Sequence, residues 1–339
     1  MNSSIPNGKE SIDTFHVLKA EQFDRPLLEY LFDLTNTIRR FDKSKEGLMY
    51  LRSLLAHRRA MLYFTQPSTR TFLSFQSACQ ILGMNCSEIR DPSTSSETKG
   101  ESIEDSLRTF SSYVDLIIMR SPVAGLCDKM AEHLDATPRP VPIINAGSGP
   151  DQHPTQALLD MYTLYRSFAK QGGIDGKTIC MVGDLKRGRT IRSLSRLLAY
   201  YPGVKIIYSS PEAFAIEDDL RQFLRDQPSI TFEETTNFDD AIASADAVYI
   251  TRIQDEWDSS HGKIECDTSA YHLTLGHMDR IKSDCVIMHP FPRRKEIDPR
   301  VDHDPRAKYW RQERNGMWTR VALITRIMGV DNKIILPPL

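Results

Sequence analysis

Short apolar runs alternate with helical patterns along most of the chain, and this alternation restricts the fold more than any other feature. Between the runs, apolar residues recur with the period of a helix, about 3.6 residues. The strand candidates are Ala60–Phe64, Val114–Met119, Val141–Asn145, Thr178–Gly183, Val204–Tyr208, Ala247–Thr251 and Cys285–His289. The helix candidates include 72–82, 103–112, 155–168 and 190–200. Such alternation is typical of parallel sheets with helices on both faces.

The Gly- and Pro-rich stretch NAGSGPDQHP divides this alternation into two groups of similar size. The chain has 339 residues, which is roughly two domains of about 150 residues each. We therefore predict an α/β protein of two domains, residues 1–150 and 151–316, each a parallel β-sheet flanked by helices. A last helical pattern follows Asn315-Gly316, and we expect the segment 317–339 to pack back on the first domain.

The composition excludes several classes of protein. The 43 Lys and Arg nearly balance the 45 Asp and Glu, for a net charge of −2, so we expect neither a nucleic-acid partner nor a membrane partner. The start MNSSIPNGKESIDTF resembles neither a signal peptide nor a transit peptide, and no apolar run approaches about 18 residues, so we expect a cytoplasmic protein. The six cysteines contain no C-x-x-C pair, which is typical of reduced thiols and predicts no metal site.

Polar clusters follow most of the strand candidates, at the positions where open parallel sheets bind their ligands. The first cluster, Pro67-Ser68-Thr69-Arg70-Thr71, begins a helix, so hydroxyls and backbone N–H groups gather at the positive end of the helix dipole. Arg70 adds a planar fork that can bind two phosphate oxygens. The cluster is therefore an anion-binding candidate. The alternative is that the hydroxyls cap the helix and Arg70 pairs with a surface carboxylate.

The second cluster contains His153 and Gln156 and opens a helix after the strand candidate Val141–Asn145. Pro154 occupies the first helical position, which leaves His153 at the helix N-terminus. The helix dipole disfavours imidazolium there, so a neutral ring can donate one hydrogen bond to a carbonyl oxygen. Gln156, one turn further on, can present its amide to the same ligand. A capping histidine without a ligand is the alternative.

The third cluster, GDLKRGRT over 183–190, carries three cations in four residues and suits a carboxylate or phosphate. A solvated basic turn is the alternative. The glycine spacing differs from G-x-G-x-x-G, and Tyr208-Ser209-Ser210 stands where a dinucleotide site needs an acid, about 20 residues further on. These differences exclude a nicotinamide-dependent dehydrogenase.

Two further clusters complete the set. Arg252 and Gln254 follow the strand candidate Ala247–Thr251 and face one side together in extended geometry. Arg120 ends another strand candidate, and the sequence HPFPR over 289–293 ends the last one, with prolines that leave carbonyls free for an –NH2 group. None of the clusters contains an activated nucleophile, a metal-ligand set or a carboxylate pair. Such a site can catalyse a displacement by positioning and charge stabilisation.

Together these clusters resemble those of the aspartate carbamoyltransferases, the catalytic chains of pyrimidine synthesis. The resemblance runs from about residue 25 to about residue 330 and rests on motifs that occur in the family's order. These motifs are Ser68-Thr69-Arg70-Thr71, Lys99-Gly100-Glu101, Met119-Arg120, His153-Pro154-Thr155-Gln156, Gly188-Arg189-Thr190, Arg252-Ile253-Gln254 and His289-Pro290-Phe291-Pro292-Arg293.

The resemblance implies one set of residues that binds carbamoyl phosphate. This set is Ser68, Thr69, Arg70, Thr71, Arg120, His153, Gln156, Phe291 and Pro292. Residues 68–71 would hold the phosphate, and Thr71, Arg120 and His153 would polarise the carbonyl. Gln156 and the loop carbonyls would bind the carbamoyl –NH2. The catalytic groups would be Arg70, Thr71, Arg120 and His153.

The resemblance also implies an aspartate site and an oligomer. Arg189 would bind the α-carboxylate of aspartate, and Arg252 with Gln254 the side-chain carboxylate. Ser95 and Lys99 would reach in from a neighbouring subunit, with Lys99 also contacting aspartate, so the active unit would be a homotrimer. The site would then lie in the interdomain cleft and at the subunit interface. Whether regulatory chains or a dihydroorotase bind the trimer is left open.

The implied reaction is direct attack of the aspartate amine on the carbamoyl carbon, giving N-carbamoyl-L-aspartate and phosphate. It needs no covalent enzyme intermediate and no cofactor. The first domain would bind carbamoyl phosphate and the second domain aspartate, and closing the two domains would bring the substrates together.

The chain departs from the family pattern at two positions that support the closed form in the family. Gln66 stands where the family usually has Glu, and Trp257 where it usually has Arg. Phe72 and Gln76 also replace charged residues. Because Gln66 and Trp257 are both neutral, no charge is left unpaired, and we expect a different closure interaction. Aspartate remains the expected acceptor; the alternatives are another amine, or a non-catalytic paralogue that binds carbamoyl phosphate.

Overall fold

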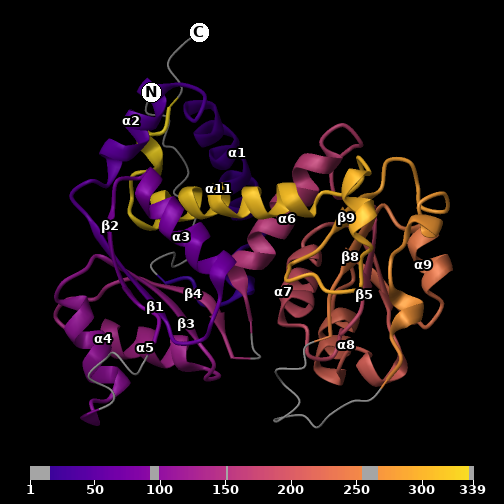
Figure 1. The fold of residues 1–339 in the computed structure, drawn as a ribbon. Helices are drawn as coiled ribbons and strands as arrows, with labels where there is room; N and C mark the ends of the chain where they lie inside the picture. Colours follow the sequence, from indigo (N-terminus) through magenta and orange to yellow (C-terminus); the bar gives the residue numbers. More distant parts are fainter. Residues whose placement is uncertain (1–15, 92–98, 150–151, 254–265, 336–339) are drawn as a thin grey trace, which may run out of the picture.

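The computed structural model describes residues 16–91, 99–149, 152–253 and 266–335. These residues form two parallel β-sheets with helices around them (Figure 1). The first sheet has the strand order β2-β1-β3-β4. Its strands are β1 (Arg59–Phe64), β2 (Asn85–Ile89), β3 (Leu116–Ser121) and β4 (Ile143–Ser148). The helices of this half are α1 (Arg25–Phe41), α2 (Lys45–Leu54), α3 (Thr69–Ile81), α4 (Ile103–Ser111) and α5 (Leu126–Asp135).

The second sheet has the strand order β7-β6-β5-β8-β9, and all of its pairings are parallel. Its strands are β5 (Thr178–Val182), β6 (Lys205–Ser209), β7 (Thr231–Thr235), β8 (Ala247–Ile250) and β9 (Val286–Met288). Around it are α7 (Arg189–Leu198), α8 (Asp218–Arg225) and α9 (Phe238–Ser244), while α6 (Pro154–Phe168) and α11 (Tyr309–Ile327) join the two halves. The predicted fold class, two parallel sheets flanked by helices, is confirmed.

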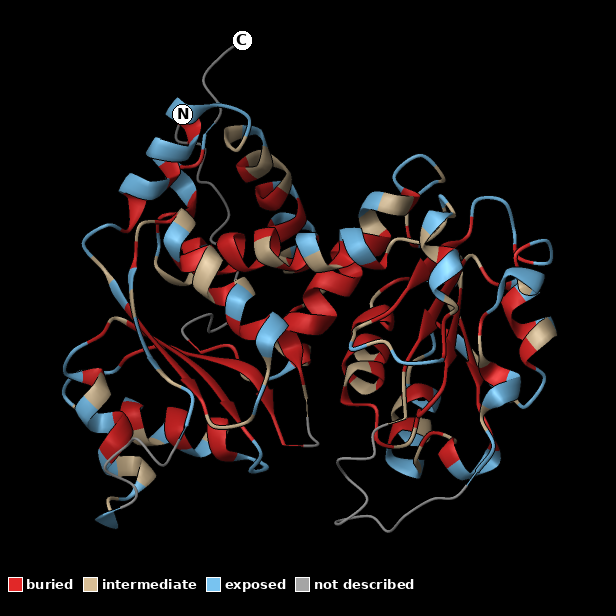
Figure 2. Ribbon diagram, in the orientation of Figure 1, coloured by how far each residue is buried: buried red, intermediate tan, exposed pale blue. Residues whose placement is uncertain are grey.

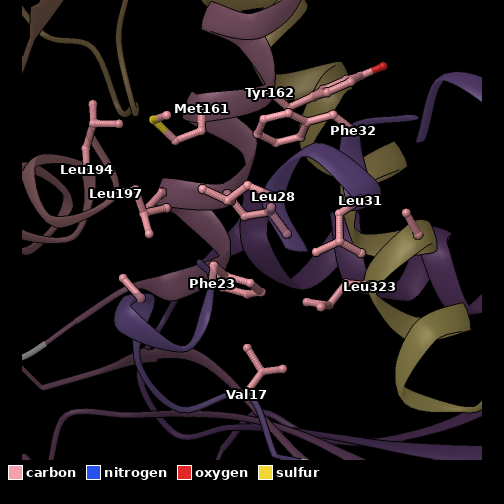
Figure 3. Packing of buried hydrophobic residues seen from close by; sticks show 14 of the residues in the cluster. Val17, Phe23, Leu28, Leu31, Phe32, Met161, Tyr162, Leu194, Leu197 and Leu323 are labelled. Atoms are coloured by element: carbon pink, nitrogen blue, oxygen red, sulfur yellow. The ribbon is translucent and has the colours of Figure 1, made fainter. Parts of the chain in front are cut away.

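One apolar core continues from the first half of the molecule into the second. It contains residues of α1, α6, α7 and α11 together with strands of both sheets. Figure 3 shows Leu28, Met161, Leu197 and Leu323, one from each of these helices, within the same cluster. In Figure 2 the inner strands of both sheets and most of α6 are buried, whereas the outer helices expose one side. Burial of apolar surface therefore fixes α6 and α11 between the sheets.

Two of the four edge strands, β2 and β7, are absent from the strand candidates of the sequence. Their sequences, NCSEI and TFEET, are polar, and several of their side chains are exposed. These two edge strands bury few side chains, so their sequences carry no apolar run. The other two edge strands, β4 and β9, are buried, and the sequence predicted them. The short helices α2, α5, α8 and α9 were not predicted either.

Helix α11 begins at Tyr309, well before the predicted start at residue 317. The pair Asn315-Gly316, which resembles a turn in the sequence, lies inside the helix. Asn315 Nδ2 donates to Thr163 Oγ1 at 3.0 Å. A Cβ atom at residue 316 would lie 2.8 Å from Leu159 Cδ2, so glycine is needed for close packing of α11 on α6. Helix α11 also packs on α1 and α3.

All six cysteines are free thiols, and four of them are buried. Burial raises the pKa of the Cys285 thiol to about 12, which keeps it protonated and unreactive. Among the described helices, none combines the length and the apolar character needed to cross a membrane.

Candidate active site

A cavity of about 470 Å³ lies where strand ends of both sheets meet α3, α6 and α11. Most of the residues that the sequence proposed for the site line this cavity. They are Ser68, Thr69, Arg70, Thr71, Arg120, His153, Gln156, Arg189, Arg252, Phe291 and Pro292. Ser95 and Gln254 lie outside the described residues, as does Trp257. Lys99 is exposed and does not line the cavity in a single chain.

The first cluster forms the N-terminus of α3. Ser68 is the N-cap residue, but its side chain makes no capping hydrogen bond, so the hydroxyl is available to a ligand. Within the described part of the chain, the carboxylate paired with Arg70 belongs to the cavity wall: Arg70 Nε lies 4.0 Å from Glu313 Oε1, and Glu313 itself lines the cavity. Both features favour the anion-binding interpretation over a helix cap with a surface ion pair.

The side chains of Arg120 and His153 both lie close to Gly147. Gly147 lies near the end of β4 with a φ of 111°, and a Cβ atom there would lie 2.5 Å from Arg120 Nη1 and 3.3 Å from His153 Cδ2. Arg120 Nη1 donates to the carbonyl of Ala146 at 3.0 Å, which fixes the guanidinium at the cavity wall. Only glycine has both the backbone conformation and the space that this approach requires.

The His153 ring is held neutral. It is buried, and burial together with the charges of Arg120, Arg189 and Arg320 lowers the pKa of His153 well below its usual value. The sequence predicted a neutral ring from the helix dipole; burial and the neighbouring arginines are the larger causes. Its Nδ1 is buried without a hydrogen-bond partner among the described residues. A neutral imidazole of this kind can donate one hydrogen bond to a substrate oxygen.

Gln156 is oriented by a carboxylate that the sequence analysis missed. Asp160 is fully buried, and its Oδ1 accepts hydrogen bonds from Gln156 Nε2 at 3.0 Å and from Gln312 Nε2 at 2.6 Å. Its Oδ2 accepts from the Tyr249 hydroxyl at 2.8 Å. Because an ionised carboxylate only accepts, Asp160 turns the Gln156 amide so that Oε1 remains for a ligand donor such as –NH2.

Of the three cations in the turn over 183–190, only Arg189 lines the cavity. Arg187 is buried, and its Nε donates to Asp184 Oδ2 at 2.8 Å, so it stabilises the turn. Lys186 lines a different surface pocket. Of the three cations that made this turn an anion-binding candidate, Arg189 alone therefore lies at the cavity; the buried charge of Arg187 needs a partner of its own.

Arg189 also joins the two halves of the molecule. Its Nη1 donates to the carbonyl of Gly149 at 2.5 Å, and both of its terminal nitrogens lie 3.5 Å from Gln66 Oε1. The neutral Gln66 thus faces the same arginine that is proposed to bind aspartate. This long contact between the Arg189 guanidinium and a neutral amide links the loop after β1 with the start of α7.

The loop after β9 is held by His289. The His289 Nε2 atom lies 2.7 Å from Glu296 Oε1, and its Nδ1 accepts from the backbone N–H of Phe291 at 2.7 Å. The peptide bond between Phe291 and Pro292 is cis, and Arg70 lies over the Phe291 ring. Arg293 turns away from the cavity and pairs with Asp302.

Two charged residues of α11 complete the wall and were missed by sequence reasoning. Arg320 is buried, and its Nη1 donates to Ser74 Oγ at 2.6 Å; burial lowers its pKa to about 10. Burial also raises the pKa of Glu313, against the opposing charges of Arg70 and Arg320. In the sequence, Arg320 and Glu313 look like ordinary charged residues on the exposed face of an amphipathic helix, so nothing there indicates that they line a site. The arginines lining the cavity are Arg70, Arg120, Arg189, Arg252 and Arg320.

Comparison with known proteins identifies the family. Residues 16–166 match the family model "Aspartate/ornithine carbamoyltransferase, carbamoyl-P binding domain", and residues 175–327 match its "Asp/Orn binding domain". The chain is 39% identical over 323 residues to the chloroplastic aspartate carbamoyltransferase of Arabidopsis thaliana, covering 92% of this chain and 77% of that protein. It is also 39% identical to the catalytic subunit from Thermoplasma acidophilum, covering 92% of this chain and 98% of that protein.

Solved structures agree with this assignment. The aspartate transcarbamoylase of Trypanosoma cruzi, in complex with carbamoyl aspartate and phosphate, superimposes with a TM-score of 0.80 at 32% identity. The match covers 91% of this chain and 94% of that chain. With two family domains in the same order and a cavity rich in arginine between them, the chain belongs to the aspartate/ornithine carbamoyltransferase family.

Proposed function

We propose that this protein transfers the carbamoyl group of carbamoyl phosphate to the amino group of L-aspartate, giving N-carbamoyl-L-aspartate and phosphate. The observation that carries the proposal is the cavity between the two sheets, which is lined by five arginines and a neutral histidine. Both substrates are anionic, and the relatives are named for this reaction. The Trypanosoma cruzi enzyme has been crystallised with carbamoyl phosphate and aspartate.

The donor binds on the side of the first sheet. The hydroxyls and backbone N–H groups at the start of α3 hold the phosphate together with Arg70. Thr71, Arg120 and His153 donate to the carbonyl oxygen, where negative charge develops. The Gln156 Oε1 atom, aligned by Asp160, accepts from the carbamoyl –NH2, as do the carbonyls of the loop around Pro292.

The acceptor binds on the side of the second sheet. Arg189 takes the α-carboxylate of aspartate, and Arg252, at the end of β8, takes the side-chain carboxylate with Gln254. The amine nitrogen then attacks the carbamoyl carbon. The new C–N bond forms first and gives a tetrahedral intermediate. The C–O bond to phosphate then breaks, and the phosphate leaves with the proton of the amine. The cationic wall stabilises the tetrahedral intermediate by electrostatics and positioning.

The active unit that we propose is a homotrimer in the cytoplasm. A single chain leaves Lys99 exposed and outside the cavity, which fits a residue that serves a neighbouring subunit together with Ser95. Association with regulatory chains or a dihydroorotase is a separate question; one relative of this chain, from Squalus acanthias, is the multifunctional protein CAD.

A steady-state assay with carbamoyl phosphate and a panel of amino acids and amines tests the proposal. Activity with aspartate supports it. Activity with another amine and none with aspartate would identify a different carbamoyltransferase, and no turnover with any amine would identify a non-catalytic paralogue.

The substitution Arg252→Met tests the acceptor site. Loss of a charge-assisted hydrogen bond costs about 1.5–3 kcal/mol, so the KM for aspartate should rise about tenfold or more, with the KM for carbamoyl phosphate nearly unchanged. Arg225→Met, at an exposed arginine at the end of α8, is the matched control. Equal KM values for aspartate in the two variants would contradict the assignment of Arg252.

A further inference from the structure

A second concave site of about 370 Å³ lies between α1, α6 and the N-terminal part of α11, and it shares no residue with the catalytic cavity. We call it the basic pocket. Its lining residues are Arg39, Thr163, Arg166, Ser167, Lys308, Arg311, Arg314 and Asn315. An α-helix turns by about 100° per residue, so Lys308 and Arg311 face away from Glu313, which lines the catalytic cavity. The two sites therefore use different faces of the same helix.

The charged residues that line the basic pocket are all positive. Five of its eight lining residues are Lys or Arg, and no lining residue is Asp or Glu. The whole chain, by contrast, has a net charge of −2. Burial lowers the pKa of Arg39, and the charges of Arg166 and Arg314 lower it further. Burial and the charge of Arg311 likewise lower the pKa of Lys308. These cations repel one another, so a bound anion would relieve an unfavourable interaction.

Hydrogen bonds and a helix N-terminus fix the residues that line the basic pocket. The buried Asn315 accepts from Arg39 Nη1 through its Oδ1 at 2.7 Å and donates to Thr163 Oγ1 at 3.0 Å, which fixes Arg39 against α6. Lys308 is the N-cap residue of α11, so the positive end of a 19-residue helix lies at the same pocket. Among the residues that the structure describes, the one carboxylate paired with a cation of the basic pocket is that of Asp42, whose Oδ2 lies 3.7 Å from Arg314 Nη2.

We propose that the basic pocket binds a small polyanion with a chain of two or more phosphate groups, such as an inorganic polyphosphate or the phosphates of a nucleoside di- or triphosphate. A single phosphate carries up to two charges and leaves most of the five cations uncompensated, whereas a phosphate chain matches them. Guanidinium forks bind phosphate oxygens in pairs, and four of the five cations are arginines.

Calorimetric titration of the intact protein with tripolyphosphate tests the proposal. The catalytic cavity also binds anions, so the wild type should show two classes of site per chain. Arg311→Gln/Arg314→Gln should weaken one class about tenfold or more, since each lost charge-assisted hydrogen bond is substantial. Arg70→Ala should weaken only the other class. The control Arg108→Gln/Arg225→Gln removes two exposed arginines elsewhere and should leave both classes in place.

Both arginines of the test variant are exposed, so its circular dichroism and melting temperature should match the wild type. If that variant does not fold, the single substitution Arg166→Gln, at another exposed lining residue, gives the same test with a smaller loss. Unchanged binding in these variants, or a wild type whose binding is all lost with Arg70→Ala, would overturn the proposal. Titration with ATP then separates the sources: affinity equal to that of tripolyphosphate means that the phosphate chain alone is recognised, and tighter binding means a nucleotide.

Discussion

At the scale of single residues, Asp160 has the most far-reaching contacts in the site. It receives hydrogen bonds from Gln156, Gln312 and Tyr249, and Gln312 Oε1 in turn accepts from the backbone N–H of His289 at 2.9 Å. One buried carboxylate thus aligns the amide proposed to bind the carbamoyl group and the loop after β9. Burial raises the pKa of Asp160 to about 7, while its three hydrogen bonds favour the charged form.

Replacing Asp160 by Asn should lower activity without removing a substrate contact. The new –NH2 group would face at least one donor, and one buried hydrogen bond to a charged group is lost, at a cost of about 1.5–3 kcal/mol. We therefore expect kcat/KM for carbamoyl phosphate to fall about tenfold or more.

A double-mutant cycle shows whether Asp160 acts through Gln156. In a Gln156→Ala background the additional effect of Asp160→Asn should shrink, because the two side chains share one interaction. The exposed Asp226→Asn serves as the control. Fully additive effects on kcat/KM would show that Asp160 does not position Gln156.

His153 should make the fold sensitive to acid. Its pKa in the folded protein lies well below the ordinary value of 6.5, so below about pH 6.5 the unfolded chain takes up a proton that the folded chain does not. Stability should therefore fall as the pH drops from 6.5 toward the folded pKa. His289, whose pKa burial also lowers, acts in the same direction.

Urea unfolding between pH 5 and pH 7 measures this effect. The free energy of unfolding of His153→Gln should decline less steeply with falling pH than that of the wild type, because the difference in bound protons is smaller. His57→Gln, at an exposed histidine, should keep the slope of the wild type. A slope in His153→Gln as steep as in the wild type would rule out this role.

At the scale of secondary-structure elements, α11 ties the molecule together. It packs on α1 and α3 of the first half and on α6, and it lines both the catalytic cavity and the basic pocket. Its close approach to α6 depends on Gly316, where a Cβ atom would meet Leu159 Cδ2 at 2.8 Å and Arg320 Nη1 at 3.2 Å. Both of those neighbours line the catalytic cavity.

Gly316→Ala should destabilise the protein although alanine is the better helix former. The intrinsic gain is about 0.5–1 kcal/mol, whereas overpacking of a tight contact costs about 1–3 kcal/mol. We expect a net loss of about 1 kcal/mol in the free energy of unfolding, measured with urea, and a lower kcat because Leu159 and Arg320 move. Gly276→Ala is the control, since a Cβ atom there has no neighbour closer than 3.7 Å. A stabilised Gly316→Ala would mean that the helices separate at no cost.

At the scale of the whole molecule, the site that we propose is shared between subunits, so two inactive variants should complement each other. In the proposed site, one subunit supplies Arg70 and its neighbour supplies Lys99, so Lys99→Ala and Arg70→Ala remove groups that different subunits supply. In a trimer assembled at random from equal amounts of both, about one quarter of the sites would combine two intact contributors. Mixing under conditions that exchange subunits should therefore restore up to about one quarter of the wild-type activity.

The matched control combines Arg70→Ala with Arg120→Ala, whose side chains line the same cavity of one chain. This pair should regain no activity on mixing, because no site then has both arginines. Mixed Lys99→Ala and Arg70→Ala trimers that stay inactive, although native mass spectrometry shows the hybrids, would exclude a shared site.

Much of the fold was predictable because buried parallel strands are apolar throughout. The apolar runs of β1, β3, β5, β6 and β8 can be read directly from the sequence. The edge strands β2 and β7 could not be, since their side chains are largely exposed and polar, unlike those of the buried edge strands β4 and β9. The start of α11 was misplaced because Asn315-Gly316 has turn chemistry, and only packing on α6 shows why a glycine stands inside a helix.

The sequence by itself determined the class of fold and the polar clusters at the strand ends, because parallel strands bring their carboxyl ends to one edge wherever they lie in the chain. The tertiary structure alone decided which charges face the cavity. Arg187 pairs with Asp184 inside its own turn, whereas Arg320, Glu313 and Asp160 become site residues through helix packing. The sequence of a helix does not show whether a polar residue on it faces water or a buried site. The elements packed around that residue determine its solvation and its partners.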